Sequence, residues 1–556
     1  MVNEKIANLF SEMAFLMELG GENPFKVRAF TNGAQVIEDA KEDIAKLAKA
    51  GRLAELKGVG KGLAAAIGEY LETGTVKEYE KLKSAYPEGL LELRDVPGLG
   101  PKRIKTLYDE LEISSLAELE YAVSENRLVE LKGFGAKTQA KIQEALVHLK
   151  ANRGRMLLPR ALDRSLDIRA ALAKLPGVKR AEETGELRRR LETIGSLDFL
   201  LETEKTLGAT AIEKALLKLE VEIADAQGGS GLLFAGKLDG VDLRVYGASA
   251  ANFAALDIQL TGSEDFLAKL PKSKAKGGFT SEEKFFQDIG LPWIPPEARE
   301  GDPREAASHT ESLVEEKDIR GVFHAHTTAS DGTATLAEMA EKCQELGLEY
   351  LGISEHSQSA GYAGGLKPDD ILRQREEIER LNAKYKGFKI FHGIESDIKN
   401  DGALDYPEKI LKEFDFVIAS LHGNFQMPRA EMTARVCAAI SHPRCTWLGH
   451  ATGRLLLGRR GVDLDMEAVL EAAGKAKKSI ELNANPYRLD LDWRHLRRAR
   501  ELKVSIGIFP DAHSTGGLED YRWGVLMARK AGLGKADVVN TKPLKEMEKW
   551  LSERRY

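Results

Sequence analysis

From about residue 319 onward, short hydrophobic segments alternate with amphipathic ones, and this alternation limits the fold more than any other feature. Seven segments are typical of strands: "GVFHAH", "YLGISEH", "KIFHGIESD", "FVIASLHG", "TWLGHA", "SIELNAN" and "VSIGIFPDAH". Helical stretches such as "LAEMAEKCQELG" and "AVLEAAGKAKK" separate them. Strands that alternate with helices pair in parallel, so we expect a barrel whose functional groups gather at the carboxyl ends of its strands.

Six of the seven segments deliver metal-binding side chains at their ends: His324, His326, Asp331, His356, Glu395, His422, His450, Asp511 and His513. His324 and His326 project together, because side chains at i and i+2 share one face of a strand. A lone His-x-His pair is more often coincidental, but six of the eleven histidines of the chain lie in these positions. Nine nitrogen and oxygen donors exceed what one ion uses, so the pattern predicts two or three divalent ions. The absence of thiolates among them favours Mn²⁺, Zn²⁺ or Fe²⁺.

The bulk composition limits what else the chain can be. Its 556 residues are too many for one core and predict about three or four domains. Three cysteines cannot build a disulfide framework, and a net charge of -6 argues against a uniformly basic nucleic-acid binder. No signal peptide and no uncharged segment near the ~20 residues of a membrane span is evident. We therefore expect a cytoplasmic protein without a membrane partner.

The first 155 residues are helical in pattern and repeat one kind of turn three times. The turns are "LKGVGKG", "VPGLGPK" and "LKGFGAK", with the glycine pairs Gly58 and Gly60, Gly98 and Gly100, and Gly133 and Gly135, followed by Lys61, Lys102 and Lys137. A glycine turn at a helix amino terminus exposes backbone N–H groups to a phosphate. A single copy is more often a tight connection between helices, but three copies followed by lysines favour an anion-binding site.

These turns look like helix-hairpin-helix motifs, which hold the DNA backbone without reading its sequence. Together with "NPFKVRAF" they resemble the amino-terminal region of family X DNA polymerases. In that family a lysine of the small domain can form a Schiff base with a 5′-deoxyribose phosphate. Its position falls at or near Ala66, so the resemblance implies that the lyase activity is absent.

Residues 156 to 295 change to shorter segments with the patterns of strands and helices. In the family, this region would form the nucleotidyltransferase palm. "GELRRRLETIGSLDFLLE" occupies the place of a signature with an Asp-x-Asp pair for two Mg²⁺, and the aligned residues are Ser196 and Asp198. Asp242 matches the third carboxylate. Ser196 is a weaker, uncharged ligand, and Glu186 places a negative charge where the family binds the triphosphate. We expect polymerase activity, with Mg²⁺ or Mn²⁺ at Asp198 and Asp242, to be weak or lost unless Glu192 or another acid substitutes.

The barrel segments resemble the PHP (polymerase and histidinol phosphatase) domain, in the version fused to bacterial family X polymerases. Glu355, Ala451 and Pro510 depart from its usual aspartate, proline and threonine, but all nine ligand positions match. The resemblance therefore implies helix-hairpin-helix domains (1–155), an α+β palm and thumb (156–295), a linker (296–318) and a distorted (β/α)7 PHP barrel (319–556).

The expected function is a DNA-repair nuclease that acts as a 3′-5′ exonuclease, and on abasic sites, with Arg454 as a catalytic phosphate clamp and Arg488 or Arg494 as further candidates. Gapped, 3′-ended or abasic DNA is the expected partner, bound without sequence preference by a monomer. Three alternatives stay open: an active DNA polymerase with a proofreading nuclease, a small-molecule phosphatase of the histidinol-phosphatase type, and a DNA-binding scaffold.

Overall fold

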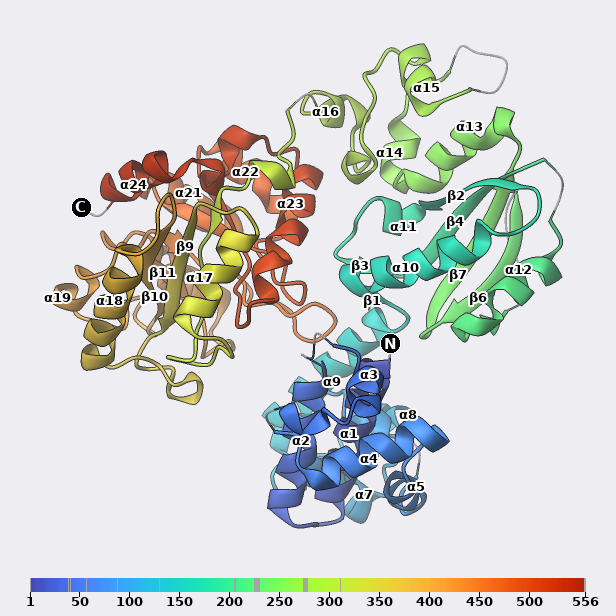
Figure 1. Ribbon diagram of the computed structural model, residues 1–556, viewed down its shortest axis with the longest axis horizontal. Coiled ribbons are helices and arrows are strands. Elements are labelled where there is room, and N and C mark those ends of the chain that lie inside the picture. Colours follow the sequence, from blue (N-terminus) through green and yellow to red (C-terminus); the bar gives the residue numbers. More distant parts are fainter. Residues whose placement is uncertain are drawn as a thin grey trace. The chain divides into compact units, whose positions relative to one another are not determined.

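The computed structural model describes residues 2–554 except 39, 41, 57, 88, 130, 205–206, 225–230, 274–278 and 311. The chain forms two compact units, Met1–Arg153 and Gly154–Tyr556 (Figure 1). The expected combination of helical domains with a nearly closed parallel barrel is confirmed. The finer domain boundaries drawn from the sequence remain predictions.

The first unit is entirely helical within the residues described. Its helices are α1 (Val2–Leu19), α2 (Pro24–Glu38), α3 (Ile44–Lys49), α4 (Lys61–Thr73), α5 (Lys77–Ser84), α6 (Leu90–Leu93), α7 (Pro101–Leu111), α8 (Leu116–Ser124) and α9 (Gly135–Asn152). Two apolar cores fill it, and α1 belongs to both, because Phe10 packs in one and Phe15 in the other. This shared helix joins the two halves of the unit.

In the second unit, the region predicted to be the palm carries a five-stranded sheet in the order β2-β4-β7-β6-β5. Its strands are β2 (Val178–Thr184), β4 (Ser196–Thr203), β5 (Glu222–Ile223), β6 (Leu232–Leu238) and β7 (Val241–Ala248), while β1 (Met156–Leu157) pairs with β3 (Thr193–Ile194). Its helices are α10 (Leu158–Leu172), α11 (Gly185–Arg188), α12 (Ala209–Leu216), α13 (Ala250–Thr261), α14 (Glu264–Lys269) and α15 (Glu282–Asp288), and α16 (Pro303–Ala307) follows in the predicted linker. Phe199 of β4 packs in the core with α10 and α12, whereas Leu200 packs with Phe253 of α13. Since neighbouring residues of a strand face opposite sides, α10 and α13 cover opposite faces of the sheet.

The barrel contains seven parallel strands in chain order. They are β8 (Gly321–Val322), β9 (Tyr350–His356), β10 (Lys389–Asp397), β11 (Phe416–Ser420), β12 (Trp447–Leu448), β13 (Ser479–Asn483) and β14 (Ile506–Phe509). The helices between and after them are α17 (Leu336–Glu345), α18 (Pro368–Asn382), α19 (Glu408–Leu411), α20 (Arg429–Ile440), α21 (Met466–Ala476), α22 (Trp493–Glu501), α23 (Tyr521–Lys530) and α24 (Leu544–Ser552) (Figure 1). A parallel bridge between Ala325 and Ala512 brings the first and last strands together.

Aromatic side chains fill the inside of the barrel below the strand ends. Phe323 contacts the rings of Tyr350, Phe391, Phe416 and Phe509, with centroids 5.0 to 5.7 Å apart, and all are buried. The barrel is therefore packed like a core rather than open like a pore, and the side chains marked as metal ligands lie at or just after the carboxyl ends of its strands.

Candidate metal centre of the barrel

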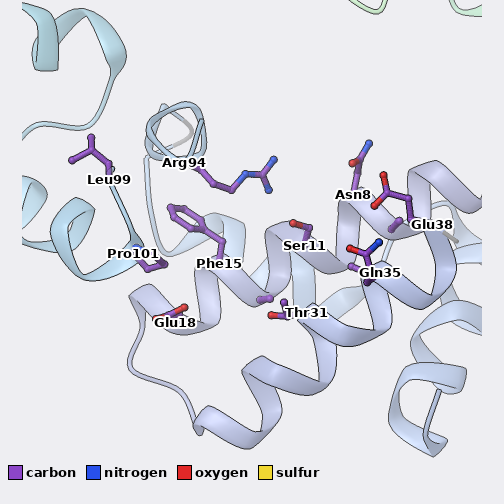
Figure 2. Close-up of a pocket in the computed structure, with 13 residues that line it drawn as sticks. Asn8, Ser11, Phe15, Glu18, Thr31, Gln35, Glu38, Arg94, Leu99 and Pro101 are labelled. Carbon is purple, nitrogen blue, oxygen red and sulfur yellow. The ribbon is translucent and has the colours of Figure 1, made fainter. Parts of the chain in front are cut away.

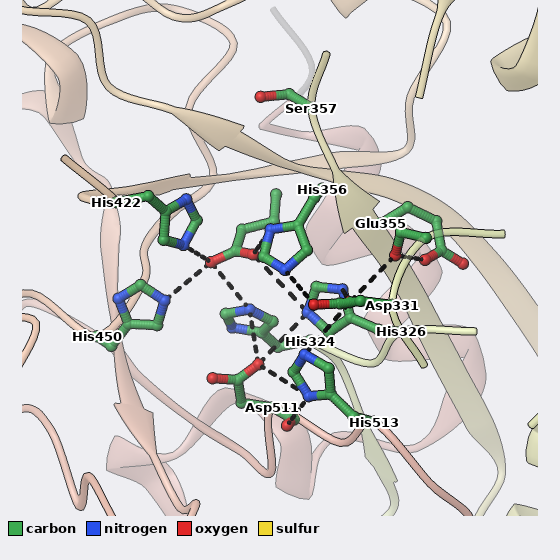
Figure 3. A network of polar contacts seen from close by, with 12 residues as sticks. His324, His326, Asp331, Glu355, His356, Ser357, His422, His450, Asp511 and His513 are labelled. Atoms are coloured by element: carbon green, nitrogen blue, oxygen red, sulfur yellow. Dashed lines mark hydrogen bonds and ion pairs between the residues drawn. The ribbon is translucent and has the colours of Figure 1, made fainter. Parts of the chain in front are cut away.

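The barrel brings together all nine residues that the sequence marks as metal ligands (Figure 3). Their donor atoms form four overlapping groups in which every donor lies within 4.8 Å of the others: His326, Asp331, His356 and His513; His324, His326 and Asp511; His324, Glu395 and His450; His356, Glu395 and His422. Within the part of the chain that the structure describes, such groups occur in the barrel alone. The overlap suits several neighbouring ions rather than one.

Glu395, at the end of β10, belongs to two of these groups. Its Oε1 lies 2.8 Å from His450 Nε2, 3.1 Å from His422 Nε2 and 3.2 Å from His324 Nε2. Its Oε2 lies 2.9 Å from His356 Nδ1. Burial alone would raise the pKa of this carboxyl, but the surrounding imidazoles hold it well below its ordinary value. An ionised carboxylate with both oxygens facing imidazoles is placed to bridge two cations.

Two aspartates complete the centre. Asp511 Oδ1 lies 3.3 Å from Nε2 of both His324 and His326. The carboxylate of Asp331 lies 3.3 Å from His356 Nε2 and 3.4 Å from His513 Nε2. His324 (φ 58°) and Asp511 (φ 52°) adopt left-handed backbone conformations that side chains other than glycine rarely occupy. Each residue adjoins a member of the parallel bridge between Ala325 and Ala512, and such strained residues are concentrated at functional sites.

Several buried polar atoms of the centre have no hydrogen-bond partner. They are Nε2 of His324, both ring nitrogens of His326, Nδ1 of His356, Oε2 of Glu395 and Nδ1 of His450. Leaving such atoms unpaired is costly, and a bound cation would satisfy those that point inward. Burial lowers the pKa of His326 to about 3, which keeps this imidazole in the neutral form that binds metals. The residues present therefore fit a group of divalent cations.

A second layer of carboxylates orients the histidines, and the sequence reasoning missed it. Glu481 Oε1 lies 2.6 Å from His324 Nδ1, and its Oε2 accepts the backbone N–H of His450 at 2.6 Å. Asp397 Oδ1 lies 2.6 Å from His422 Nδ1. A carboxylate on one ring nitrogen directs the other toward the metal. The only signal in the sequence is an acid within a strand, which does not reveal its partner.

Glu355, the departure from the family aspartate, supports the loop that carries Asp331. The side chain is fully buried and accepts hydrogen bonds from the backbone and hydroxyl of Thr327, the hydroxyl of Ser330 and the amide of Gln374. The longer side chain thus still reaches the loop without entering the metal centre itself.

The arginines differ in their relation to the centre. Arg454, the sequence candidate for a phosphate clamp, is bound by the Asp492 carboxylate at 2.5 Å and by the carbonyl oxygens of Arg488 and Leu489. Arg494 binds Glu192 at 2.9 Å. Arg488 lies closest to the centre, with Nε 3.4 Å from Asp511 Oδ2. Its side chain is the better placed to reach a phosphate bound at the metals.

The palm does not group its acids as the barrel does. Ser196 and Asp198 lie on β4 beside Asp242 and Arg244 of β7, but Arg244 Nε binds Asp198 Oδ1 at 2.9 Å and Ser196 Oγ at 3.0 Å. Asp242 is exposed and faces Lys237 at 3.7 Å. Burial raises the pKa of Asp198, which Arg244 opposes. An arginine therefore occupies the space beside the remaining carboxylate.

Two further acids of the palm signature are already paired. Glu186 Oε2 accepts the backbone N–H of Gly195 at 2.8 Å and the Arg155 guanidinium at 2.9 Å. Glu192, the possible substitute ligand, accepts hydrogen bonds from the indole of Trp493 and the guanidinium of Arg494. Among the residues described, neither carboxylate forms a candidate cation-binding group with Asp198.

The three glycine turns of the helical unit lie where the sequence places them. Gly60 and Gly100 precede α4 and α7 as amino-terminal caps, and Gly135 is the first residue of α9. Gly58, Gly98 and Gly133 have φ of 105°, 87° and 89°, a left-handed region that only glycine enters freely. Lys61, Lys102 and Lys137 are exposed beside these turns. The turns can therefore accept a phosphate at a helix amino terminus.

The same unit holds a polar hollow of about 390 Å³ beside the second turn (Figure 2). Asn8, Ser11, Gln35 and Glu38 line it together with Arg94. Carboxylates and a guanidinium share this hollow, and nothing in its lining resembles the barrel centre.

No helix among the residues described is long and apolar enough to cross a membrane.

Comparison with known proteins agrees with the arrangement. Residues 1–76 match a helix-hairpin-helix domain, residues 90–147 a SAM-like helix-hairpin-helix tandem and residues 323–485 a PHP domain. The chain is 34% identical to the DNA polymerase/3′-5′ exonuclease PolX of Bacillus subtilis, over 99% of both chains. The barrel region is 28% identical to a probable phosphatase of Thermoanaerobacter sp., over 42% of this chain and 94% of that protein. The first match covers helical unit, palm and barrel in one alignment, and the chain therefore belongs to the family X DNA polymerases that carry a PHP domain.

Proposed function

We propose that the protein is a DNA-repair nuclease whose barrel hydrolyses phosphodiester bonds from 3′ ends and at abasic sites. The observation that carries the proposal is the convergence of nine residues with nitrogen and oxygen donors at one end of the barrel, of which all but the exposed Asp331 are buried or half-buried. The helix-hairpin-helix turns supply sequence-independent DNA binding, since exposed N–H groups and lysines contact phosphates rather than bases. Gapped, 3′-ended and abasic DNA are the proposed substrates.

The proposed ligands are the nine residues of the four groups, holding two or three ions. Imidazoles and carboxylates without thiolates suit Mn²⁺ or Zn²⁺, and also Fe²⁺. When bound, such ions lower the pKa of a water molecule and neutralise charge on the attacked phosphate. Glu395, which belongs to two of the groups, would hold ions of both, and Glu481 and Asp397 orient the rings of His324 and His422 for binding. Arg488 is proposed to hold a nonbridging oxygen of the phosphate, a role for which a guanidinium is suited.

Polymerase activity is proposed to be weak or lost. A two-metal polymerase site needs carboxylates that can reach both ions, whereas Ser196 offers a hydroxyl and Arg244 occupies Asp198. The Glu186 carboxylate accepts the backbone N–H of Gly195. An incoming phosphate would have to compete with this negatively charged group for the same N–H. We propose that the palm now serves mainly to join the DNA-binding unit to the nuclease, in a protein that works as a cytoplasmic monomer.

A small-molecule phosphatase is the second candidate, because the probable phosphatase relative matches the barrel over nearly its whole length. The helical unit favours the nuclease, since a phosphomonoesterase for small substrates gains nothing from DNA-binding turns.

The test compares wild-type protein with the His324→Ala, His326→Ala double variant on labelled single-stranded, gapped and abasic DNA with Mn²⁺, with and without nucleotides. The proposal expects shortened or incised products from wild type alone, while DNA affinity of the double variant stays within a few fold. Hydrolysis of small phosphomonoesters with no action on any DNA would establish the phosphatase instead. Equal DNA hydrolysis by the double variant would refute the metal assignment.

A further inference from the structure

An exposed aromatic ring lies beside the metal centre. Tyr362 belongs to the short turn Gly361–Ala363 that follows β9, and 74% of its surface is accessible to solvent. Its ring centroid is 6.3 Å from that of His356, one of the proposed ligands. The structure thus places a large, planar, solvent-exposed side chain next to a proposed metal ligand at the carboxyl end of the barrel strands.

The backbone around Tyr362 is firmly held. Ala360 and Ala363, which flank Tyr362 in the sequence, are buried, and the Ala363 N–H donates to the Ala360 carbonyl at 2.9 Å. Leu366 N–H donates to the carbonyl of His356 at 2.9 Å, and the Tyr406 hydroxyl donates to the Leu366 carbonyl. The turn is therefore a rigid support that directs its tyrosine outward, rather than a loose loop on which any side chain would be exposed.

The positions of exposed apolar side chains on the barrel point to the same end. Among the barrel residues described, the large hydrophobic side chains that are clearly exposed are Tyr362, Leu372 and Tyr487. Both tyrosines follow the carboxyl end of a strand, β9 for Tyr362 and β13 for Tyr487, and Tyr487 precedes Arg488. Among the barrel residues described, the exposed aromatic rings therefore lie at the same end of the barrel as the metal centre and Arg488, whose guanidinium is paired with Asp511.

Resting on the nuclease function above, we propose that Tyr362 stacks on the terminal nucleobase of an unpaired 3′ end whose phosphate lies at the metal centre. A nucleotide bound by its phosphate extends its base away from the ions, toward the surface that this ring occupies. Aromatic side chains bind bases of every kind through their faces, which suits a nuclease without sequence preference. A paired base already stacks within its helix, so this contact selects single-stranded or frayed ends.

The test is a cycle that removes the ring from the protein and the base from the substrate. Single-stranded oligonucleotides ending in a normal nucleotide or in an abasic residue are cleaved by wild type, Tyr362→Ala, Tyr362→Leu and Tyr362→Phe. With the normal end, KM is expected to rise roughly 10-fold for the alanine variant and by a smaller factor for leucine, with kcat little changed and phenylalanine close to wild type. With the abasic end, all four proteins should show the same KM.

The controls separate a contact with the base from a change in structure. Leu372→Ala removes an exposed apolar side chain from α18 and should leave KM for both substrates unchanged. Metal content and the unfolding midpoint should be equal in all variants. Equal losses on normal and abasic ends in Tyr362→Ala would show a merely structural role and overturn the inference, as would no loss at all. Failure of wild type to cleave either oligonucleotide would instead refute the proposed nuclease.

Discussion

Replacing Glu481 by glutamine tests whether the carboxylates behind the histidines control metal binding. Glu481 is inaccessible to solvent, and both of its oxygens accept: Oε1 lies 2.6 Å from His324 Nδ1, and Oε2 lies 2.6 Å from the His450 backbone nitrogen. Glutamine keeps the shape but offers one acceptor and one donor in place of two acceptors. One of the two contacts must therefore become unfavourable.

Each orientation of the new amide has a defined cost. If its NH₂ faces His324, the imidazole must accept at Nδ1 and carry its proton on Nε2, the atom that faces Glu395 at 3.2 Å and Asp511 at 3.3 Å. That tautomer cannot bind a cation through Nε2. If the NH₂ faces His450 instead, a buried backbone N–H loses its acceptor, at a cost of roughly 1–3 kcal/mol. Loss of a carboxylate behind a ligating histidine typically lowers metal affinity about 10- to 100-fold, or about 1.4–2.8 kcal/mol.

The assay is competition of the purified protein with a chelator for Zn²⁺ and for Mn²⁺. Glu481→Gln should bind at least one ion about 10- to 100-fold more weakly, whereas Asp257→Asn, which changes an equally buried carboxylate of the palm, should bind all ions as wild type does. In a His324→Ala background the same change should cost far less, because the two residues act through one contact. An affinity within two-fold of wild type for Glu481→Gln would refute the reasoning.

Three further predictions concern the other parts of the chain. Lys102→Glu should weaken DNA binding alike on all sequences and lower the slope of log affinity against log salt concentration by about one, and a loss confined to particular sequences would contradict backbone binding. In a nuclease-silenced chain, a primer-extension assay should show little synthesis by the parent or by Ser196→Asp or Glu186→Ser alone and a gain only when both changes are combined; efficient synthesis by the parent would make the palm a working polymerase. Burial alone would raise the pKa of Glu282, but hydrogen bonds from Arg299 and a second arginine lower it to about 2 from 4.5. A lowered pKa stabilises the fold above pH 4.5 by about 3 kcal/mol, and this is lost as the pH falls toward 2. The stability difference between wild type and Glu282→Gln in urea unfolding should therefore shrink over that range, and a difference that stays constant would disprove the linkage.

The barrel and its centre were predictable because geometry leaves little choice. Once seven strands run parallel, the residues at or just after their carboxyl ends, such as His324, His356 and His450, must meet at one end of the barrel. The expectation that His324 and His326 share one face of a strand was wrong, because β8 ends at Val322 and His324 has a left-handed backbone. The role of the nine residues as ligands remains a prediction. The same reasoning cannot rank Arg454 against Arg488, since both follow strand ends and their directions depend on loop contacts such as the pair between Arg454 and Asp492. Nor can it see Glu481 behind His324, because 157 residues separate them and a buried acid inside a strand has no periodicity of its own.

In the palm, sequence comparison identifies which carboxylate is missing but not what replaces it. Ser196 can be read from the motif, whereas the position of Arg244 on Asp198 follows from the register of β4 and β7. That register is a tertiary property, fixed by packing on both faces of the sheet. The glycine turns are predictable for the opposite reason, because their conformation is dictated locally by residues such as Gly98.

The bridge between Ala325 and Ala512 also determines when the metal centre can come into existence. Its proposed ligands begin at residue 324, just after the first strand, and end at residue 513, just after the last, so a ribosome must reach residue 513 before the centre can close. A chain that stops before residue 511 contains the helix-hairpin-helix turns but lacks Asp511 and His513. Under the function proposed above, such a fragment would bind DNA without cutting it, so the order of the parts along the chain places DNA binding before cleavage during synthesis.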